Sequence, residues 1–134
     1  MLNEAAERGR LNDQYRPLCA DAESLPVESG SQGLVFSCFA LQWCDPTRVM
    51  AEVHRVLAPG GRLLLAVPLA GSLRELSQSW QAVNHRPHVN ALPTLGDWQE
   101  ASLRVGFADV QIQQQVMVEY YESVKQIARR LKAT

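Results

Sequence analysis

The sequence predicts an α/β fold, because two continuous apolar runs flank one amphipathic segment. The runs cover residues 33–40 and 62–68, and the segment between them starts at Asp45-Pro46. Strands that are apolar on both faces are typical of the middle of a parallel sheet that is covered on each side. A strand, a helix and a strand in this order form a right-handed crossover. We therefore expect a mostly parallel sheet with helices on both faces.

The helix between the two strands has clear start and stop signals. Asp45 is expected to cap the free amide groups of the first turn, where Pro46 also fits. Valines then recur at helical spacing and predict the buried face. The Ala-Pro-Gly-Gly run at 58–61 is expected to end the helix and turn the chain into the second strand.

The other elements follow from the same two periodicities. The expected helices cover 2–10, 73–83, 95–105 and the segment after Ser123, and a short strand is expected over 15–20. Residues 108–119 alternate with a period of two, which predicts a half-exposed antiparallel strand at a sheet edge. Trp80 and Trp98 lie on the apolar faces of their helices and are expected in the core.

The bulk composition limits the classes of partner. The chain has 134 residues, of which 46% are apolar, and this suits one domain over 1–134. A net charge of −1 argues against a nucleic-acid or anionic-membrane surface, because both need a marked basic excess. The sequence shows neither the roughly 20-residue apolar run of a membrane span nor a signal-peptide pattern. We therefore expect a cytoplasmic protein that binds no nucleic acid and no membrane.

The three cysteines, Cys19, Cys38 and Cys44, do not have the spacing of a metal or redox site. Two of them stand in apolar stretches, so buried reduced thiols are expected, with a catalytic cysteine as the alternative. His85 and His88 lie three apart in a loop, which does not by itself make a metal site. We expect no metal.

Ligands of open α/β sheets bind beyond the carboxyl ends of the strands, where residues 21–26, 37–43 and 68–72 are expected. Much of this region carries a family pattern. The matching passages are Asp-Ala-Glu-Ser-Leu-Pro at 21–26, Val-Phe-Ser at 35–37, Ala-Leu-Gln-Trp-Cys at 40–44 and Glu-Val-His-Arg-Val-Leu-Ala-Pro-Gly-Gly-Arg-Leu at 52–63. With these passages the chain resembles the class I S-adenosylmethionine-dependent methyltransferases over nearly its whole length.

Three shorter passages narrow the resemblance. They are Leu-Gln-Trp at 41–43, Arg-Pro-His-Val-Asn at 86–90 and Leu-Lys-Ala at 131–133. With them the chain is most similar to the enzymes of biotin synthesis that methylate a malonyl group on acyl carrier protein. The resemblance implies that a methyl group passes from S-adenosylmethionine to the free carboxyl of that malonyl thioester and leaves S-adenosylhomocysteine.

The resemblance also implies which residues hold the cofactor. Asp21 would accept a hydrogen bond from the exocyclic amine of adenine, and the amide of Ala22 would face the ring. Ser37, Phe39 and Ala40 match the turn that lies near the methionine part of the cofactor.

Residues that contact the acceptor substrate are expected in the same turn and in a later polar loop. Gln42 is able to donate a hydrogen bond, and Trp43 either walls the site or packs in the core. Arg86 would align the acceptor carboxylate, because its guanidinium is a planar fork. His88 and Asn90 lie in the same loop as Arg86 and are further candidates, with plain surface groups as the alternative.

The family comparison also indicates what the chain lacks. The family begins with a strand and a glycine-rich turn, which lets the backbone approach the cofactor closely. The glycines present here, at 30, 33, 60 and 61, have a different place and spacing. The family's final strand has no counterpart either. We therefore expect a partial Rossmann-like methyltransferase sheet, the C-terminal portion of that fold, which is inactive by itself.

Two other functions compete with this interpretation. A sheet without its first strands exposes edges that invite pairing with another chain, which predicts a non-catalytic self-associating domain or a homodimer. A nucleotide-binding oxidoreductase fragment is the second alternative, and the missing Gly-x-Gly-x-x-Gly run weakens it. The alternative to the adenine role of Asp21 is that it merely ends a strand in a turn. Glu23 is expected to be solvated.

Overall fold

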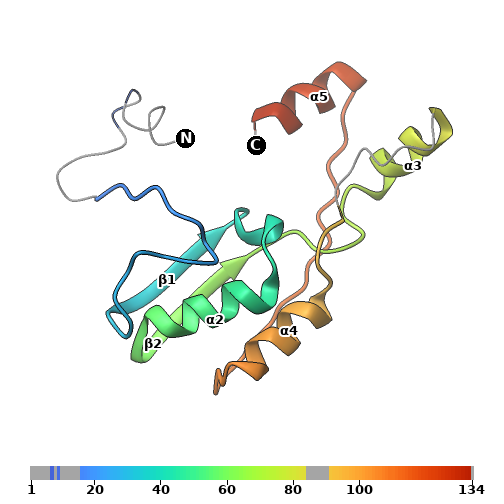
Figure 1. The fold of residues 1–134 in the computed structure, drawn as a ribbon. Helices are drawn as coiled ribbons and strands as arrows, with labels where there is room; N and C mark the ends of the chain where they lie inside the picture. Colours follow the sequence, from blue (N-terminus) through green and yellow to red (C-terminus); the bar gives the residue numbers. More distant parts are fainter. Residues whose placement is uncertain (1–6, 8, 10–15, 84–90, 134) are drawn as a thin grey trace.

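The computed structural model describes residues 7, 9, 16–83 and 91–133. Within them, a two-stranded parallel sheet pairs β1 (Gln32–Cys38) with β2 (Leu57–Ala66). The other elements are the 3-10 turn η1 (Leu41–Trp43) and the helices α2 (Pro46–Val56), α3 (Arg74–Val83), α4 (Leu95–Arg104) and α5 (Val124–Ala133) (Figure 1). The predicted strand–helix–strand crossover is therefore confirmed. The helix expected over 2–10 lies almost wholly outside the described residues.

Helix α2 forms where the sequence predicts it. The Asp45 side chain accepts a hydrogen bond from the Thr47 amide at 2.8 Å, and Pro46 occupies the first turn. This cap satisfies one of the amides that a helix start leaves without an intrahelical partner. The apolar face of the helix is buried throughout, at Val49, Met50, Val53 and Val56.

The core lies between α2, α4 and one face of the sheet. Trp98 and Ala101 of α4 pack with the buried face of α2, and Leu63 and Leu65 of β2 close the cluster from the sheet side. Figure 1 shows α2 across the sheet and α4 beside α2. Each fully buried aliphatic side chain contributes about 1.5–3 kcal/mol, so this small cluster accounts for much of the hydrophobic stabilisation. The prediction that Trp98 is a core residue is confirmed, whereas Trp80 is 39% exposed.

The turn predicted at 58–61 is instead part of β2, as an irregularity in the ladder. Gln32 pairs with Leu57, but Leu34 pairs with Arg62, so the register shifts between these positions. Gly60 takes a positive φ of 79°, and a Cβ on Gly61 would lie 2.9 Å from the carbonyl oxygens of Ala58 and Gln32. Only glycine fits at 61, because no other residue lets the two strands approach so closely.

Only one face of the sheet is covered by the described residues, so the prediction of helices on both faces is wrong for this part of the chain. On the other face Leu34, Phe36 and Leu64 are 59%, 63% and 60% exposed. Helices α3 and α5 extend away from the sheet (Figure 1). The apolar runs do form the two strands, but which face is covered depends on other segments.

Two predicted strands are not formed. Residues 16–20 have no regular structure, and Asp21 makes only an isolated bridge with Ser24. Residues 108–119 also contain no strand, and Val116 and Met117 are 81% and 75% exposed. The antiparallel edge strand is therefore a wrong prediction. Alternation alone does not make a strand, because a strand is stable only when a neighbour pairs with it.

The three later helices are confirmed close to their predicted bounds. Helix α4 begins with a reciprocal cap, in which Thr94 accepts from the Asp97 amide while Asp97 accepts from the Thr94 amide. It ends before Gly106, which has a φ of 94°. No helix in the described part of the chain has the length and apolar character that crossing a bilayer requires.

Candidate functional site at the carboxyl end of the sheet

The carboxyl ends of β1 and β2 are joined through Phe39, the first residue after Cys38. The Phe39 amide donates to the Ala66 carbonyl oxygen at 2.8 Å, and the Phe39 carbonyl accepts from Nε2 of Gln42 at 3.0 Å. Phe39 has a φ of 53°, in the left-handed region that residues other than glycine rarely adopt. Strained residues of this kind gather at functional sites. The two hydrogen bonds of Phe39 therefore fix the backbone of the turn from Phe39 to Trp43 at this end of the sheet.

The turn that carries Asp21 lies at the same end of the sheet. Its Oδ1 accepts from the Glu23 amide at 2.9 Å, and its carbonyl accepts from the Ser24 amide at 3.1 Å. Burial raises the pKa of the Cys44 thiol, and the nearby carboxylates of Glu23 and Asp21 raise it further. The Asp45 amide, just beyond η1, donates to the side chain of Glu23, two residues after Asp21, so Asp21 and the turn after β1 share one end of the sheet.

Glu23 connects the Asp21 turn to the start of α2, so the expectation that it is solvated is wrong. Its Oε1 accepts from the Asp45 amide at 2.8 Å, and its Oε2 lies 2.8 Å from the Arg48 guanidinium. The Glu23 side chain is only 14% exposed. Asp45 caps α2, so Glu23 ties the segment that carries Asp21 to the start of the helix. Nothing in the spacing of 23 and 45 indicates this contact.

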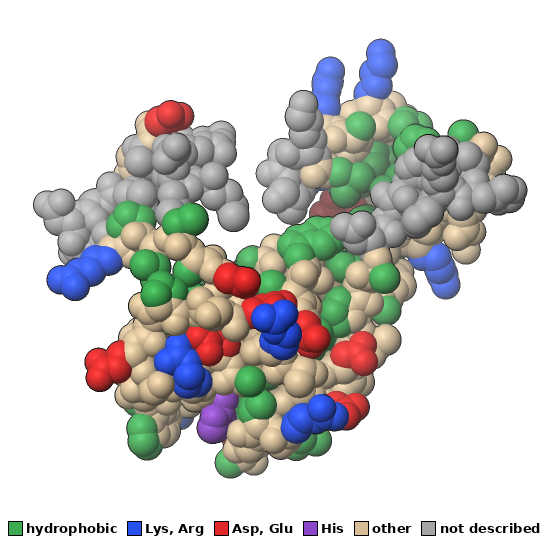
Figure 2. All heavy atoms as spheres, in the orientation of Figure 1, with side chains coloured by type: hydrophobic (Ala, Val, Ile, Leu, Met, Phe, Trp, Pro, Cys, Tyr) green, Lys and Arg blue, Asp and Glu red, His purple; other side chains and the backbone are tan. Residues whose placement is uncertain are grey.

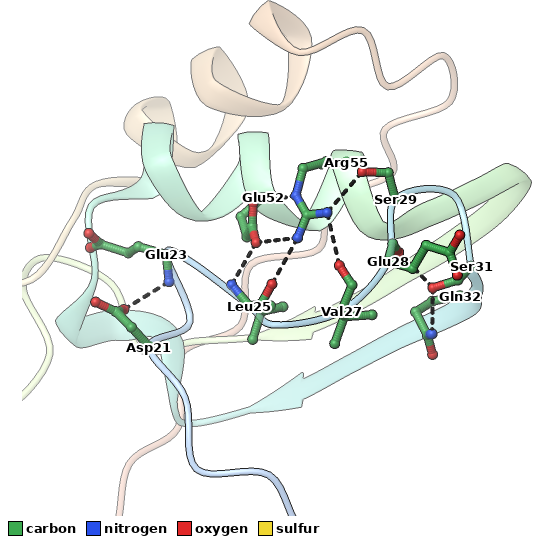
Figure 3. A network of polar contacts seen from close by, with 10 residues as sticks. All are labelled: Asp21, Glu23, Leu25, Val27, Glu28, Ser29, Ser31, Gln32, Glu52 and Arg55. Atoms are coloured by element: carbon green, nitrogen blue, oxygen red, sulfur yellow. Dashed lines mark hydrogen bonds and ion pairs between the residues drawn. The ribbon is translucent and has the colours of Figure 1, made fainter.

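A second polar network fixes the same segment farther along α2, as Figure 3 shows. Arg55 donates to the carbonyl oxygens of Leu25 and Val27 and to the Ser29 hydroxyl, each at 2.9 Å. Glu52 holds the guanidinium from its other side and also accepts from the Leu25 amide at 2.6 Å. The hydrogen bonds from Arg55 and from the Leu25 amide lower the pKa of Glu52 to about 2.

This network was missed at the sequence level. The pair at 52 and 55 has the i,i+3 spacing of helical ion pairs, which is the one local signal that was available. Its partners between 25 and 29 are mostly backbone groups, which no residue pattern displays. In Figure 2, acidic and basic side chains lie beside one another on the face that carries α2, in keeping with this pairing.

The aromatic side chains of the turn point outward, whereas Gln42 is buried. Phe39 and Trp43 are 54% and 65% exposed, so the alternative that Trp43 is a core residue is wrong. Gln42 is only 8% exposed and uses its amide nitrogen on Phe39. A direct contact between Gln42 and an acceptor substrate stays a prediction.

The remaining predicted residues divide into those placed beside this turn and those not described. Ser37 is half-buried and alternates with exposed Cys38, while Ala40 is exposed within the turn. Arg86, His88 and Asn90 lie outside the described residues. In the described ranges, no group of three or more His, Cys, Asp or Glu side chains gathers as metal ligands would.

The prediction of buried thiols is wrong for two of the three cysteines. Cys19 and Cys38 are exposed, and Cys44 is half-buried. Cys38 is exposed because it lies on the uncovered face of the sheet, where successive strand residues alternate between faces. None of the three is in a disulfide.

The parallel strand–helix–strand crossover agrees with the comparisons to known proteins. The profile of the family described as "Methyltransferase domain" matches residues 1–65. The fold is similar to that of a methyltransferase from Thermotoga maritima, titled as S-adenosylmethionine-dependent and a possible histamine N-methyltransferase. The TM-score is 0.52 at 20% identity, over 69% of this chain and 45% of that one. The chain belongs to the class I S-adenosylmethionine-dependent methyltransferases.

Two curated relatives are named malonyl-[acyl-carrier protein] O-methyltransferase. The relative from Alcanivorax borkumensis is 78% identical over 134 residues, which is 100% of this chain and 46% of the relative. The relative from Laribacter hongkongensis is 40% identical over 117 residues, which is 87% of this chain and 39% of the relative. The chain therefore spans less than half the length of these curated relatives.

Proposed function

We propose that this chain forms part of a cytoplasmic O-methyltransferase that uses S-adenosylmethionine and methylates the free carboxyl of a malonyl thioester on acyl carrier protein. The identity of 78% to the Alcanivorax borkumensis relative, which carries that name, is the observation that supports it most strongly. Because the chain matches 46% of that relative, the proposal concerns the whole enzyme to which such a segment contributes.

The turn at Asp21 fits the adenine end of the cofactor. A carboxylate has two oxygens that accept hydrogen bonds. The Glu23 amide uses Oδ1 of the exposed Asp21, so Oδ2 is the oxygen that we assign to the exocyclic amine of adenine. The amide of Ala22 is assigned to a ring nitrogen. Glu23 holds this turn against the start of α2.

The turn after β1 fits the methionine end. The Phe39 and Ala40 backbone, together with Ser37 at the end of the strand, would lie against this part of the cofactor. Phe39 and Trp43 are exposed there and offer apolar walls that exclude water from a bound ligand. The residues proposed to face the acceptor are Gln42, Trp43, Arg86, His88 and Asn90.

The proposed mechanism depends on positioning. S-adenosylmethionine supplies an activated methyl group on its sulfonium when it is bound. The acceptor carboxylate is already ionised near neutral pH, so this chain needs no general base to activate it. Asp21 and the Phe39 turn would orient the donor, while Arg86 would align the acceptor carboxylate through two parallel hydrogen bonds. Holding two reactants in line in this way lowers the entropic part of the barrier.

Titration calorimetry with S-adenosylhomocysteine tests this proposal. We expect weak or no binding by the 134-residue chain alone. Binding is expected in a chimera in which this chain replaces the 134 residues that it matches in the Alcanivorax borkumensis relative. In the chimera Asp21→Ala should weaken binding by roughly tenfold or more, because a charge-assisted hydrogen bond is lost. The matched control is Asp109→Ala, because Asp109 is an exposed acid in residues 108–119, which have no regular structure.

Different outcomes of this titration lead to different conclusions. A chimera that ignores S-adenosylhomocysteine but binds a nicotinamide dinucleotide would favour the oxidoreductase alternative. If it binds S-adenosylhomocysteine but transfers no methyl group to malonyl-acyl carrier protein, the cofactor assignment holds and the acceptor assignment fails. If the chimera does transfer the methyl group, Arg86→Ala should raise the KM for malonyl-acyl carrier protein and leave cofactor binding unchanged; an unchanged KM would contradict the role proposed for Arg86.

Self-association is a second candidate, and the uncovered face of the sheet is the observation that favours it. Leu34, Phe36 and Leu64 expose apolar surface side by side on two paired strands. In the described residues the sheet has only two strands, so each strand also has an unpaired edge. Sedimentation of the isolated chain should show dimers or larger species that Leu64→Lys reduces. A monomer that keeps its native sheet would contradict this candidate.

A further inference from the structure

Phe39 takes a backbone conformation that its side chain disfavours, at a position where a glycine would take it freely. Its φ is 53°, and it is the first residue beyond β1. A left-handed residue other than glycine is unfavourable because Cβ approaches the backbone too closely. Such a conformation persists only where its surroundings hold it.

Two hydrogen bonds hold Phe39, one from its amide and one to its carbonyl. The amide donates to Ala66 at the end of β2, at 2.8 Å. The carbonyl accepts from Nε2 of Gln42, at 3.0 Å. Gln42 belongs to η1 and is 8% exposed, so this bond is shielded from competing water. The backbone of the turn is thereby fixed to the neighbouring strand and to the 3-10 turn together.

The contact requires a donor at position 42. A carbonyl oxygen only accepts, so the amide nitrogen of Gln42 must face Phe39. The other amide atom, Oε1, is buried and has no hydrogen-bond partner among the described residues. Leaving a buried acceptor unpaired is unfavourable. Gln42 therefore uses its amide nitrogen to hold Phe39, while its buried Oε1 accepts no hydrogen bond.

We infer that Gln42 is a positioning residue: by donating to Phe39 it holds the left-handed turn, and so sets where the Phe39 and Ala40 backbone faces the cofactor. The inference rests on the proposed function for its link to the cofactor. Its link to Phe39 rests on the geometry alone. Gln42 acts in it through the turn, without touching the cofactor.

A double-mutant cycle in the chimera tests the inference. Gln42→Met keeps much of the volume and removes the donor. We expect it to weaken S-adenosylhomocysteine binding about tenfold, as the loss of one buried hydrogen bond predicts. Gln42→Met is then combined with Phe39→Ala in one variant and with Phe39→Gly in another. Both remove the ring, but only glycine adopts the left-handed conformation without strain. The weakening should persist with alanine and fall below about threefold with glycine.

Two results of the binding measurements overturn the inference. One is unchanged binding by Gln42→Met. The other is equal weakening in all three backgrounds, which are the parent Phe39, Phe39→Ala and Phe39→Gly, because Gln42 would then act by a route other than this turn. If Gln42→Met does not fold with Phe39 in place, the variant that also carries Phe39→Gly must fold, and its failure to do so counts against the inference as well.

Amide hydrogen exchange in the 134-residue chain separates this test from the proposed function. Gln42→Met should speed exchange of the Phe39 amide by about tenfold, because its bond to Ala66 then opens more often. The amide of buried Val53 in α2 is the control and should be unchanged. Unchanged Phe39 exchange overturns the inference even if the chimera binds the cofactor. Faster exchange without any cofactor binding keeps the local role and removes the proposed function instead.

Discussion

Glu52 and Arg55, one turn apart on α2, form a two-point ion pair that fixes the segment before β1. Arg55 Nε lies 2.8 Å from Glu52 Oε2, and Nη2 lies 2.6 Å from Oε1. The same two side chains hold backbone groups of Leu25 and Val27. The pair therefore connects α2 to the segment that carries Asp21, about 30 residues earlier in the chain.

Glu52→Gln should lower the melting temperature of the chain by about 3–6 °C, because the carboxylate charge is lost and the amide nitrogen of Gln cannot accept one of the two bonds from Arg55. The Glu52 side chain is 13% exposed, so water replaces these bonds poorly. Glu28→Gln, an exposed acid in the same segment, is the control and should leave the melting temperature within about 1 °C. A thermal denaturation curve followed by circular dichroism measures both. Equal effects of the two changes would contradict a special role for Glu52.

The stability of the chain should also depend on pH through Glu52. Its pKa is lowered from the ordinary 4.5 to about 2 in the fold. A lowered pKa means that the ionised carboxylate stabilises the fold above about pH 4.5, and that this stabilisation is lost as the pH falls toward about 2. Between about pH 5 and pH 3 the free energy of unfolding should fall more steeply for the parent chain than for Glu52→Gln. Parallel curves from urea denaturation would refute this assignment.

Gly61→Ala should lower the free energy of unfolding by about 2 kcal/mol, because the new methyl group forces the two strands apart. Its Cβ would lie 2.9 Å from the carbonyl oxygens of Ala58 and Gln32. Gly33→Ala is a matched control, since nothing lies within 4 Å of its Cβ and its backbone is not left-handed. Urea denaturation should show little change for the control. A similar loss in both variants would mean that close packing at Gly61 is not the cause.

Glu23 should stabilise the fold mainly through its bond to the Asp45 amide. Glu23→Gln keeps an acceptor for that amide and loses only the pairing with Arg48, which is 66% exposed. We expect it to cost less than about 0.5 kcal/mol, as for other exposed ion pairs. Glu23→Ala removes the acceptor and should cost about 1 kcal/mol. If the two variants are equally unstable in urea, the ion pair and not the amide bond is the stabilising contact.

Local signals in the sequence were enough for the central crossover. The cap at Asp45, the first-turn Pro46 and the valine spacing of α2 each act within a few residues, so they predicted the helix correctly. The cofactor residues beside Phe39 were predicted through the family pattern, and their role stays a prediction. The structure brings the Asp21 turn to the same end of the sheet. The conformation of Phe39 was not predicted, because a positive φ at phenylalanine has no sequence signal.

The failed predictions all concern contacts between distant segments. Residues 108–119 alternate like a strand, yet they find no strand to pair with among the described residues. Glu23 was expected in solvent, but it meets Asp45, 22 positions later. Cys38 was expected in the core and faces the uncovered side of the sheet.

By itself, the sequence determined the order of strands and helices in the central crossover, the buried stripe of α2 and the family, because caps, periodicity and motifs are written in neighbouring residues. Only the tertiary structure decided which sheet face is covered, which acids hold the Asp21 segment and how Gln42 supports Phe39. The physical reason is that burial and hydrogen bonding depend on which segments meet in space. The local sequence of each segment does not specify which distant segment it will contact.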